Sequence, residues 1–115
     1  MVFTASISGY NNVAPANGIY GTSKSALSAY MKYAALELAG KGIRCNAVHP
    51  GRINTPLISN RMLTEEDVAK DVEQYPLKRY GEPSEVAHAI IYLLSDAASW
   101  VTGTNLVIDG GRSLK

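Results

Sequence analysis

Three short apolar stretches, each of a length typical of β-strands, alternate along this chain with longer segments of helical patterning. The expected strands are residues 1–5, 43–49 and 104–111. Residues 43–49, "IRCNAVH", are mostly apolar and too short for a helix, as buried parallel strands are. Strands that alternate with helices predict a parallel sheet with right-handed crossovers. We therefore expect an α/β fold with three strands, a helix layer on each face and at least one unpaired sheet edge.

The helix expected over residues 20–39 shows an apolar face and a clear stop. Its apolar side chains recur at intervals of three and four residues and are Leu27, Met31, Ala34 and Leu38. Gly40 and Gly42 follow, and glycine is the usual residue just beyond a helix. The preceding segment, residues 8–18, is rich in Gly, Asn and Pro and is expected to be a loop.

Two further helices are expected after a loop at residues 52–63. Thr64 precedes three acidic residues and resembles a capping box, which opens a weakly amphipathic helix through Val68 and Val72. Pro83 occupies a position favoured at the first residue of a helix. The apolar face of that last helix is formed by Val86, Ile90, Leu93 and Leu94.

The composition is that of a folded globular domain without strong charge. Among the 115 residues, 46% are hydrophobic and 18% are charged, which fits one domain rather than a disordered chain. A net charge of +1 gives no reason to expect nucleic acid or an anionic membrane as partner, and no apolar run has the length of a membrane span. Cys45 is the only cysteine and cannot form an internal disulfide, so we expect a reducing compartment, the cytoplasm.

The opening residues, "MVFTA", are apolar and β-prone without a polar lead-in. Amino termini of complete domains are usually exposed and frayed. We therefore expect this chain to be a piece of something longer.

Tyr20 and Lys24 stand four residues apart in "YGTSK", at the start of the first expected helix. On a helix such residues are neighbours. A free tyrosine has a pKa of about 10, and a nearby cation favours the phenolate. The pair can therefore exchange a proton with a substrate oxygen, as the interconversion of a carbonyl and a hydroxyl requires. The spacing alone also fits a solvated lysine beside a half-buried tyrosine.

Ser6 and Ser8 follow the first expected strand, and Pro50-Gly51 closes the second. Parallel sheets place their sites at this carboxyl edge. A hydroxyl group there can hold a carbonyl oxygen in line for the tyrosine. Taken alone, Pro50-Gly51 is equally a strand-ending turn.

From Val2 to Gly111 the chain resembles the carboxyl-terminal half of the short-chain dehydrogenase/reductases. The segments that carry the resemblance, in the order and spacing of that family, are "TASISG", "YGTSK", "GIRCNAVHPGRINTP" and "RYGEPSEVAHAIIYLLSDAASWVTGTNLVIDGG". In look the chain is closest to members like the 3-oxoacyl-acyl-carrier-protein reductases. The resemblance implies that residues 1–115 are one partial domain, the carboxyl-terminal part of a Rossmann-type doubly wound sheet without its amino-terminal dinucleotide-binding half.

The resemblance implies a Ser-Tyr-Lys site. Tyr20 would be the general acid/base, Lys24 would lower its pKa and hold the nicotinamide ribose, and Ser6 would orient the substrate carbonyl. The spacing from Ser6 to Tyr20 is one residue longer than the family usually has, and Ser8 remains the alternative serine. The reaction implied is NAD(P)-dependent interconversion of a carbonyl and a secondary alcohol.

A second part of the resemblance concerns the cofactor. Pro50, Gly51, Ile53 and Thr55 match the family's "PGxIxT" loop, which packs against the nicotinamide. Residues 54–75 would be the mobile segment that covers the substrate. Nothing in these residues chooses between NAD and NADP or names the substrate.

The chain also departs from the family pattern. No GxxxGxG or GxGxxG phosphate loop occurs in the 115 residues, and Asn11, Asn12 and Asn17 are loop residues rather than the family's catalytic asparagine. Two hypotheses follow. The chain is either part of an oxidoreductase, inactive in isolation, or a truncated product or subunit-interface module that binds no cofactor.

The remaining distinctive residues favour structural roles. His49 is expected to be a hydrogen-bonded structural histidine, His88 to be exposed and Cys45 to be a small buried apolar residue. Two distant histidines and one cysteine predict no metal site. Trp100 and Tyr92 are expected to be packing residues. The helix from Tyr20 carries apolar residues on more than one face, and the matching helix of the family joins subunits, so we expect a homo-oligomer.

Overall fold

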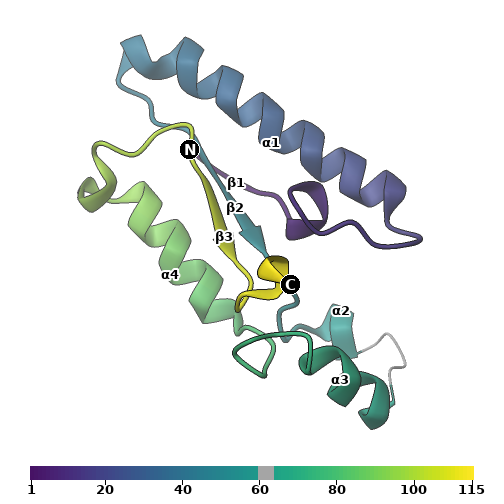
Figure 1. Ribbon diagram of the computed structural model, residues 1–115. Helices are drawn as coiled ribbons and strands as arrows, with labels where there is room; N and C mark the ends of the chain where they lie inside the picture. Colours follow the sequence, from purple (N-terminus) through teal and green to yellow (C-terminus); the bar gives the residue numbers. More distant parts are fainter. Residues whose placement is uncertain (60–63) are drawn as a thin grey trace.

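The computed structural model describes residues 1–59 and 64–115, and its centre is a three-stranded parallel sheet. The strands β1 (Val2–Thr4), β2 (Asn46–Pro50) and β3 (Asn105–Ile108) lie in the order β1-β2-β3. Thr4 pairs with Val48, and Val48 pairs with Leu106. All three carboxyl ends therefore meet at one edge (Figure 1). The predicted α/β class and parallel pairing are confirmed.

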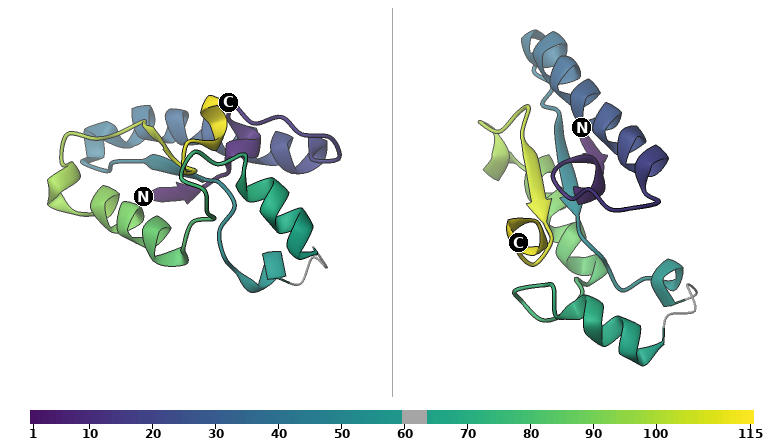
Figure 2. Two further views of the ribbon diagram at one scale, coloured as in Figure 1. Left: turned by 60° about the horizontal axis from the view of Figure 1, so that its bottom comes forward. Right: turned by 45° about the vertical axis from the view of Figure 1, so that its right-hand side comes forward.

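The helices form one layer on each side of this sheet. Helix α1 (Gly18–Leu38) covers one face and α4 (Pro83–Leu94) covers the other, as the left view of Figure 2 shows. Between α1 and the sheet lies a cluster of buried side chains formed by Met31, Ala34, Ala35, Cys45 and Ala47. Cys45 is fully buried, as predicted. Small residues on α1 and β2 allow the helix to approach the sheet closely.

Helix α1 ends near the predicted position, through the second of the two predicted glycines. A 3₁₀ turn, η2 (Ala39–Lys41), continues the helix past Gly40. Gly42 then adopts a positive φ of 71°, and its amide donates to the carbonyl of Ala39. Glycine adopts this left-handed conformation without a steric penalty. Gly42 is therefore the residue that stops the helix.

Two predicted loops contain short helical turns. The 3₁₀ turn η1 (Ile7–Gly9) overlaps the start of the expected loop 8–18, and α2 (Pro56–Ser59) lies in the expected loop 52–63. Both are too short to give a periodic pattern. Residues 60–63 of that loop lie outside the described residues. Helix α3 (Glu65–Val72) begins with the predicted capping box, in which Thr64 and Asp67 bond reciprocally.

Strands β2 and β3 are shorter than predicted. Residues 43–45 precede β2 because they bond to the loop before β3: the Cys45 amide donates to Thr102 Oγ1, and the Cys45 carbonyl accepts from Gly103. Beyond β3, Gly110 and Gly111 have φ of 59° and 81° and turn the chain. Residues in a β-strand have negative φ, so neither glycine can extend β3.

Two predicted packing residues are instead on the surface. Trp100 is 99% exposed and Tyr92 is 44% exposed. Leu94, assigned to the apolar face of the last helix, is also exposed, whereas its neighbour Leu93 is buried. A helix that packs on a sheet buries one stripe of its side chains, and on α4 this stripe includes Leu93 but not Tyr92 or Leu94. Pro83 begins α4 as predicted, and His88 on that helix is exposed as predicted.

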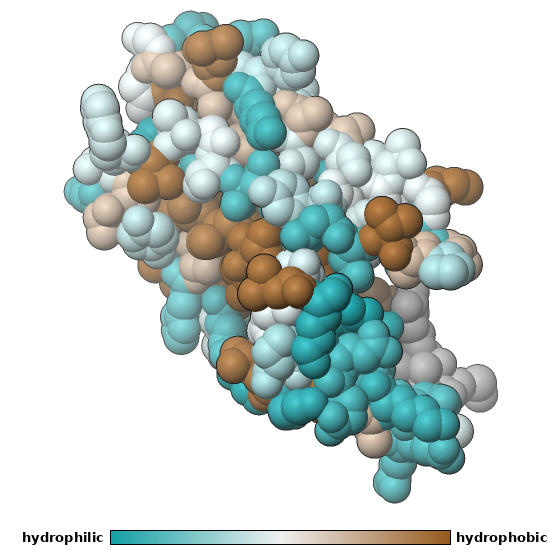
Figure 3. Space-filling view, viewed as in Figure 1, coloured by the Kyte–Doolittle hydropathy of each residue, from teal (hydrophilic) through white to brown (hydrophobic). Residues whose placement is uncertain are grey.

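The surface divides by character along the molecule. On the face seen in Figure 1, Figure 3 shows apolar surface in the middle, over β3, and hydrophilic surface over α3. None of the helices within residues 1–59 and 64–115 is long and apolar enough to cross a membrane.

Candidate active site

Ser6 lies at the carboxyl end of β1, where the strand gives way to the turn η1. Sheet pairing extends to Ala5, whose amide donates to the Val48 carbonyl at 2.9 Å. Ser6 is the extended residue that caps η1, and its Oγ accepts a hydrogen bond from the Ser8 amide at 3.2 Å. A hydroxyl has one hydrogen and two acceptor sites. This bond therefore orients the Ser6 hydroxyl while leaving its hydrogen available for a substrate oxygen.

The turn that carries Ser6 is held tightly against α1 through two glycines. A Cβ atom added at Gly9 would lie 2.5 Å from backbone atoms of Lys24 and Ser25. One added at Gly21 would lie 2.8 Å from the carbonyl oxygen of Ser8. The Ser25 hydroxyl also donates to the Gly9 carbonyl at 2.8 Å. Because no side chain fits between them, the Ser6 turn and the helix turn of Lys24 are in direct backbone contact.

Tyr20 and Lys24 point to the same side of α1, as the spacing predicts. The Nζ atom of Lys24 lies 5.7 Å from the centroid of the Tyr20 ring. The same ammonium group donates to the carbonyl oxygen of Thr4, the last residue of β1, at 3.0 Å. Tyr20 is 48% exposed, so its phenol is open to a ligand. Lys24 therefore reaches back to the sheet edge, where its ammonium has a backbone partner.

The loop Pro50–Thr55 leaves the sheet at the same edge. Gly51 passes so close to the residue after β3 that an added Cβ would lie 3.0 Å from Asp109. Ile53 forms an isolated parallel bridge with Gly81, and the Asn54 amide donates to the Gly81 carbonyl at 2.8 Å. Thr55 directly precedes α2. The backbone of this loop is thus fixed on both sides.

Arg52 connects this loop to the segment that contains α3. Its guanidinium pairs with Asp71 at 2.9 Å and donates to the Tyr80 hydroxyl at 3.5 Å. Its backbone amide donates to the Tyr75 hydroxyl at 3.3 Å. Both tyrosines are buried, and burial raises the pKa of each. Sequence reasoning missed this cluster, because its members have no characteristic spacing.

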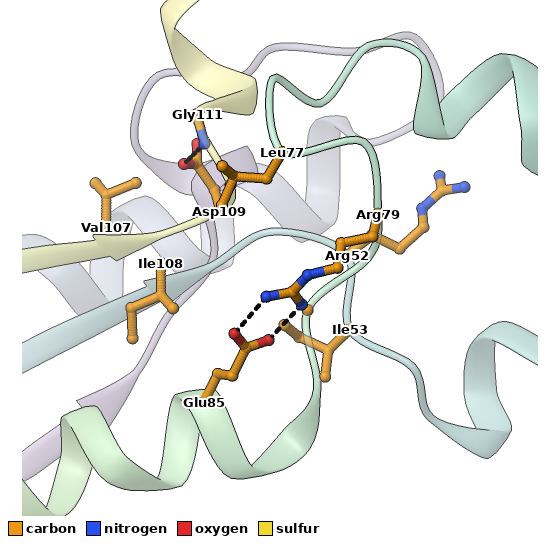
Figure 4. Close-up of a pocket in the computed structure, with 11 residues that line it drawn as sticks. Arg52, Ile53, Leu77, Arg79, Glu85, Val107, Ile108, Asp109 and Gly111 are labelled. Carbon is orange, nitrogen blue, oxygen red and sulfur yellow. Dashed lines mark hydrogen bonds and ion pairs between the residues drawn. The ribbon is translucent and has the colours of Figure 1, made fainter.

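A cavity of about 280 Å³ lies beside this loop but apart from the predicted catalytic side chains. Figure 4 shows it between the end of β3, the loop around Arg79 and the start of α4. Arg79 and Glu85 form a two-pronged pair at 2.7 Å along its wall. The hydrogen bond from Arg79 lowers the pKa of Glu85 to about 2. Ser6, Tyr20 and Lys24 do not line this cavity.

The structure thus brings the predicted residues to one sheet edge without joining all of them directly. Lys24 contacts Tyr20 and the end of β1, and the Ser6 turn rests on the Lys24 turn. Ser6 Oγ itself bonds to Ser8 rather than to Tyr20 or Lys24. Catalytic hydrogen bonds are often completed only when a ligand is present. The edge therefore carries a serine hydroxyl, a phenol and a cation, which are the groups that the sequence predicted for this site.

Comparison with known proteins identifies the same architecture in longer enzymes. Residues 1–113 match the family model described as enoyl-(acyl carrier protein) reductase. The chain is 45% identical to cyclohexanol dehydrogenase of Acinetobacter sp. (strain SE19), covering 100% of this chain and 43% of that protein. It is 40% identical to levodione reductase of Leifsonia aquatica, covering 98% and 44% respectively.

Solved structures agree with these sequence relatives. A short-chain type dehydrogenase/reductase from Mycobacterium ulcerans superposes with a TM-score of 0.92 at 38% identity, covering 99% of this chain and 41% of that one. A 4-hydroxyisoleucine dehydrogenase complexed with NADH gives 0.93 at 34% identity, covering 99% and 46%. The chain therefore spans less than half the length of the relatives that it matches.

Proposed function

Because the chain belongs to the short-chain dehydrogenase/reductase family, we propose that it forms the proton-handling half of an NAD(P)-dependent site that interconverts a carbonyl and a secondary alcohol. The observation that carries this proposal is the position of Lys24. Its ammonium lies over the Tyr20 ring and is held there by the Thr4 carbonyl. A fixed cation beside a phenol stabilises the phenolate, which is the state that proton transfer from Tyr20 produces.

Tyr20 and Ser6 share the substrate oxygen in this mechanism. In the direction of reduction, Tyr20 gives its hydroxyl proton to the oxygen of the former carbonyl, and in oxidation it takes that proton back. The Ser6 hydroxyl donates a hydrogen bond to the same oxygen and stabilises the charge that develops on it. Ser6 suits this role better than Ser8 because it caps η1 at the strand end, with its oxygen oriented by the Ser8 amide.

The residues present fit one end of a nicotinamide dinucleotide. Lys24 offers an ammonium at the sheet edge for the ribose, and the fixed loop of Pro50, Gly51, Ile53 and Thr55 would lie against the ring. The absence of a side chain at Gly51 allows the backbone to run close to β3. When bound, the nicotinamide supplies or accepts the hydride. The choice between NAD and NADP lies with residues that these 115 do not include.

The test is a chimera in which this chain replaces the matching portion of the cyclohexanol dehydrogenase relative. Turnover is followed by nicotinamide absorbance with a panel of secondary alcohols and ketones and with both dinucleotides. Tyr20→Phe should lower kcat by about two to four orders of magnitude. Tyr92→Phe, which removes the same hydroxyl from an exposed position on α4, is the matched control. Undiminished turnover in Tyr20→Phe would remove Tyr20 from the mechanism.

The 115-residue chain by itself is proposed to be inactive. The family's phosphate loop, which places a pyrophosphate at a helix amino terminus, has no counterpart in this sequence. Titration of the isolated chain with NADH and with NADPH, followed by nicotinamide fluorescence, should show no saturable binding. Tight binding would contradict the view of this chain as a partial domain. If the chain is instead a subunit-interface module, the isolated chain should likewise show no saturable dinucleotide binding. In that case, however, the chimera should show no turnover.

Assembly is proposed to occur through α1, in a cytoplasmic setting. Besides its buried face and Tyr20, this helix exposes four other large apolar or aromatic side chains, which are Ile19, Tyr30, Tyr33 and Leu36. Exposed apolar surface of this kind marks interaction sites. A homo-oligomer that pairs α1 with its copy would cover it. Light scattering of the chimera and of Leu36→Glu, which places a charge on this surface, would test the arrangement.

A further inference from the structure

His49 is a buried polar residue that contacts Ser6, and packing alone does not explain its role. It lies on β2 and is 0% exposed. Its Nδ1 atom lies 2.9 Å from the carbonyl oxygen of Ser6, and its Nε2 atom lies 2.9 Å from Oδ1 of Asn105. The predicted hydrogen-bonded structural histidine is therefore confirmed. Its partners, however, include the backbone of the residue proposed to hold the substrate.

The role of Nδ1 can be assigned from the Ser6 carbonyl, because a backbone carbonyl only accepts, whereas the roles at Nε2 and Asn105 depend on the tautomer. The Ser6 carbonyl has no hydrogen and already accepts from the Gly9 amide at 3.1 Å, which leaves one lone pair for His49. Nδ1 must therefore carry a hydrogen. The tautomer of a histidine is set by such contacts. His49 thus donates this hydrogen to the Ser6 carbonyl.

The other ring nitrogen connects His49 to α1 and β3. The Ser28 hydroxyl lies 3.4 Å from Nε2 and donates to Asn105 Oδ1 at 2.9 Å. Ser28 is one helical turn beyond Lys24 on the same side of α1. Tyr10 covers the ring, with centroids 4.8 Å apart. One buried imidazole thereby ties together the end of β1, helix α1 and strand β3.

From these contacts we infer that His49 is a positioning residue for Ser6. Its Nδ1 hydrogen holds the Ser6 backbone, and its contact with Ser28 holds the ring against α1. Ser6 is thereby fixed relative to Tyr20 and Lys24 on the same helix. This inference rests on the proposed function for the role of Ser6. His49 does not touch the substrate, because its ring is wholly enclosed. Its effect is exerted through the backbone of Ser6, whose carbonyl belongs to the same short turn as the Ser8 amide that orients the hydroxyl.

The first test reads the ring hydrogen in the unmodified chain. The chain has two histidines, and the exposed His88 serves as the internal reference. Long-range ¹H–¹⁵N correlation spectra should show His49 with a hydrogen on Nδ1 that exchanges slowly with solvent, and His88 with fast exchange. A self-associated sample can be read by solid-state ¹⁵N spectra in the same way. A His49 ring that carries its only hydrogen on Nε2 would overturn the inference.

The second test separates the donor from the shape of the side chain. Asn and Leu are nearly isosteric, but only Asn places an N–H group where Nδ1 stood. In the chimera, His49→Leu should lower kcat on the order of tenfold relative to His49→Asn, with a smaller change in KM, because a small misplacement of a catalytic group is costly. Both variants lose the bond to Asn105, so that loss cancels in the comparison.

The outcomes distinguish this inference from the proposed function. Equal kcat values for His49→Leu and His49→Asn, together with a large loss in Tyr20→Phe, would overturn the positioning role and leave the proposed function intact. Undiminished turnover in Tyr20→Phe would overturn both. If neither His49 variant folds, the position of the ring hydrogen in the unmodified chain decides the inference.

Discussion

The Nζ atom of Lys24 lies 3.0 Å from the carbonyl oxygen of Thr4, and this bond closes part of an open sheet edge. The Met1 carbonyl and the Ala5 amide both bond to β2. Because backbone groups in a strand alternate in direction, those of Val2 and Thr4 turn away from β2. The ammonium of Lys24 thus satisfies an outward-facing carbonyl, which fixes its position beside Tyr20 without any contact to a ligand.

Loss of this ammonium should remove most of the activity of the chimera. We expect Lys24→Met to lower kcat by about two orders of magnitude or more, since Tyr20 would have to form a phenolate without its cation. Lys32→Met, on an exposed position of the same helix, should leave kcat unchanged. Steady-state kinetics of the two variants provide the comparison. Equal activity in both would contradict the role of Lys24.

A methyl group at Gly9 should destabilise the fold and displace Ser6. The added Cβ would lie 2.5 Å from the backbone of Lys24, and a backbone cannot yield as a flexible side chain does. Gly9→Ala should lower the free energy of unfolding by roughly 1–3 kcal/mol. Gly40→Ala, where an added Cβ meets nothing within 4 Å, is the control and should be neutral or slightly stabilising. Urea denaturation of both variants measures the difference.

The pair formed by Arg52 and Asp71 should stabilise the fold more than a surface pair does. Its side chains are 30% and 23% exposed, against 70% and 76% for Lys70 and Glu66. Asp71→Asn should lower the free energy of unfolding by about 1 kcal/mol, because it leaves a partly buried guanidinium without its counterion. Glu66→Gln should change it by at most about 0.5 kcal/mol. Equal values from urea denaturation would contradict this ranking.

Acid should weaken the contact between Arg79 and Glu85. The pKa of Glu85 is lowered from 4.5 to about 2, chiefly by the hydrogen bond from Arg79. A lowered pKa in the folded state means that the pair stabilises the fold above pH 4.5 and that this contribution is lost as the pH falls toward about 2. The Tm of the unmodified chain should therefore fall more steeply over this range than that of Glu85→Gln. Parallel curves would exclude a contribution from this pair.

The outer edge of β1 should make the isolated chain associate with itself. Within residues 1–59 and 64–115, no strand pairs with this edge. Open edges of this kind pair with other chains. Sedimentation velocity should show dimers or larger species, and Val2→Pro, which removes an outward-facing N–H, should reduce them. A monodisperse monomer with a cooperative melt would contradict this expectation.

Local signals in the sequence determined the elements of this protein. The capping box at Thr64, Pro83 at the start of α4 and the four-residue spacing of Tyr20 and Lys24 all act within one helical turn, so each can be recognised without a structure. The parallel sheet followed from the alternation of strands and helices. The order of segments along the chain likewise sufficed to place it in its family.

The tertiary structure decided how these elements meet. Lys24 reaches Thr4 across 20 residues, and His49 reaches Ser6 and Asn105 across 43 and 56 residues. The fold also leaves Trp100 and Tyr92 uncovered, although both were expected to be packing residues. Helix propensity and capping arise from interactions between residues that are close in the sequence. Burial and backbone contact depend instead on which distant segment of the chain packs beside a residue. That is why the sequence revealed the proposed catalytic residues, and only the fold revealed what holds them in place.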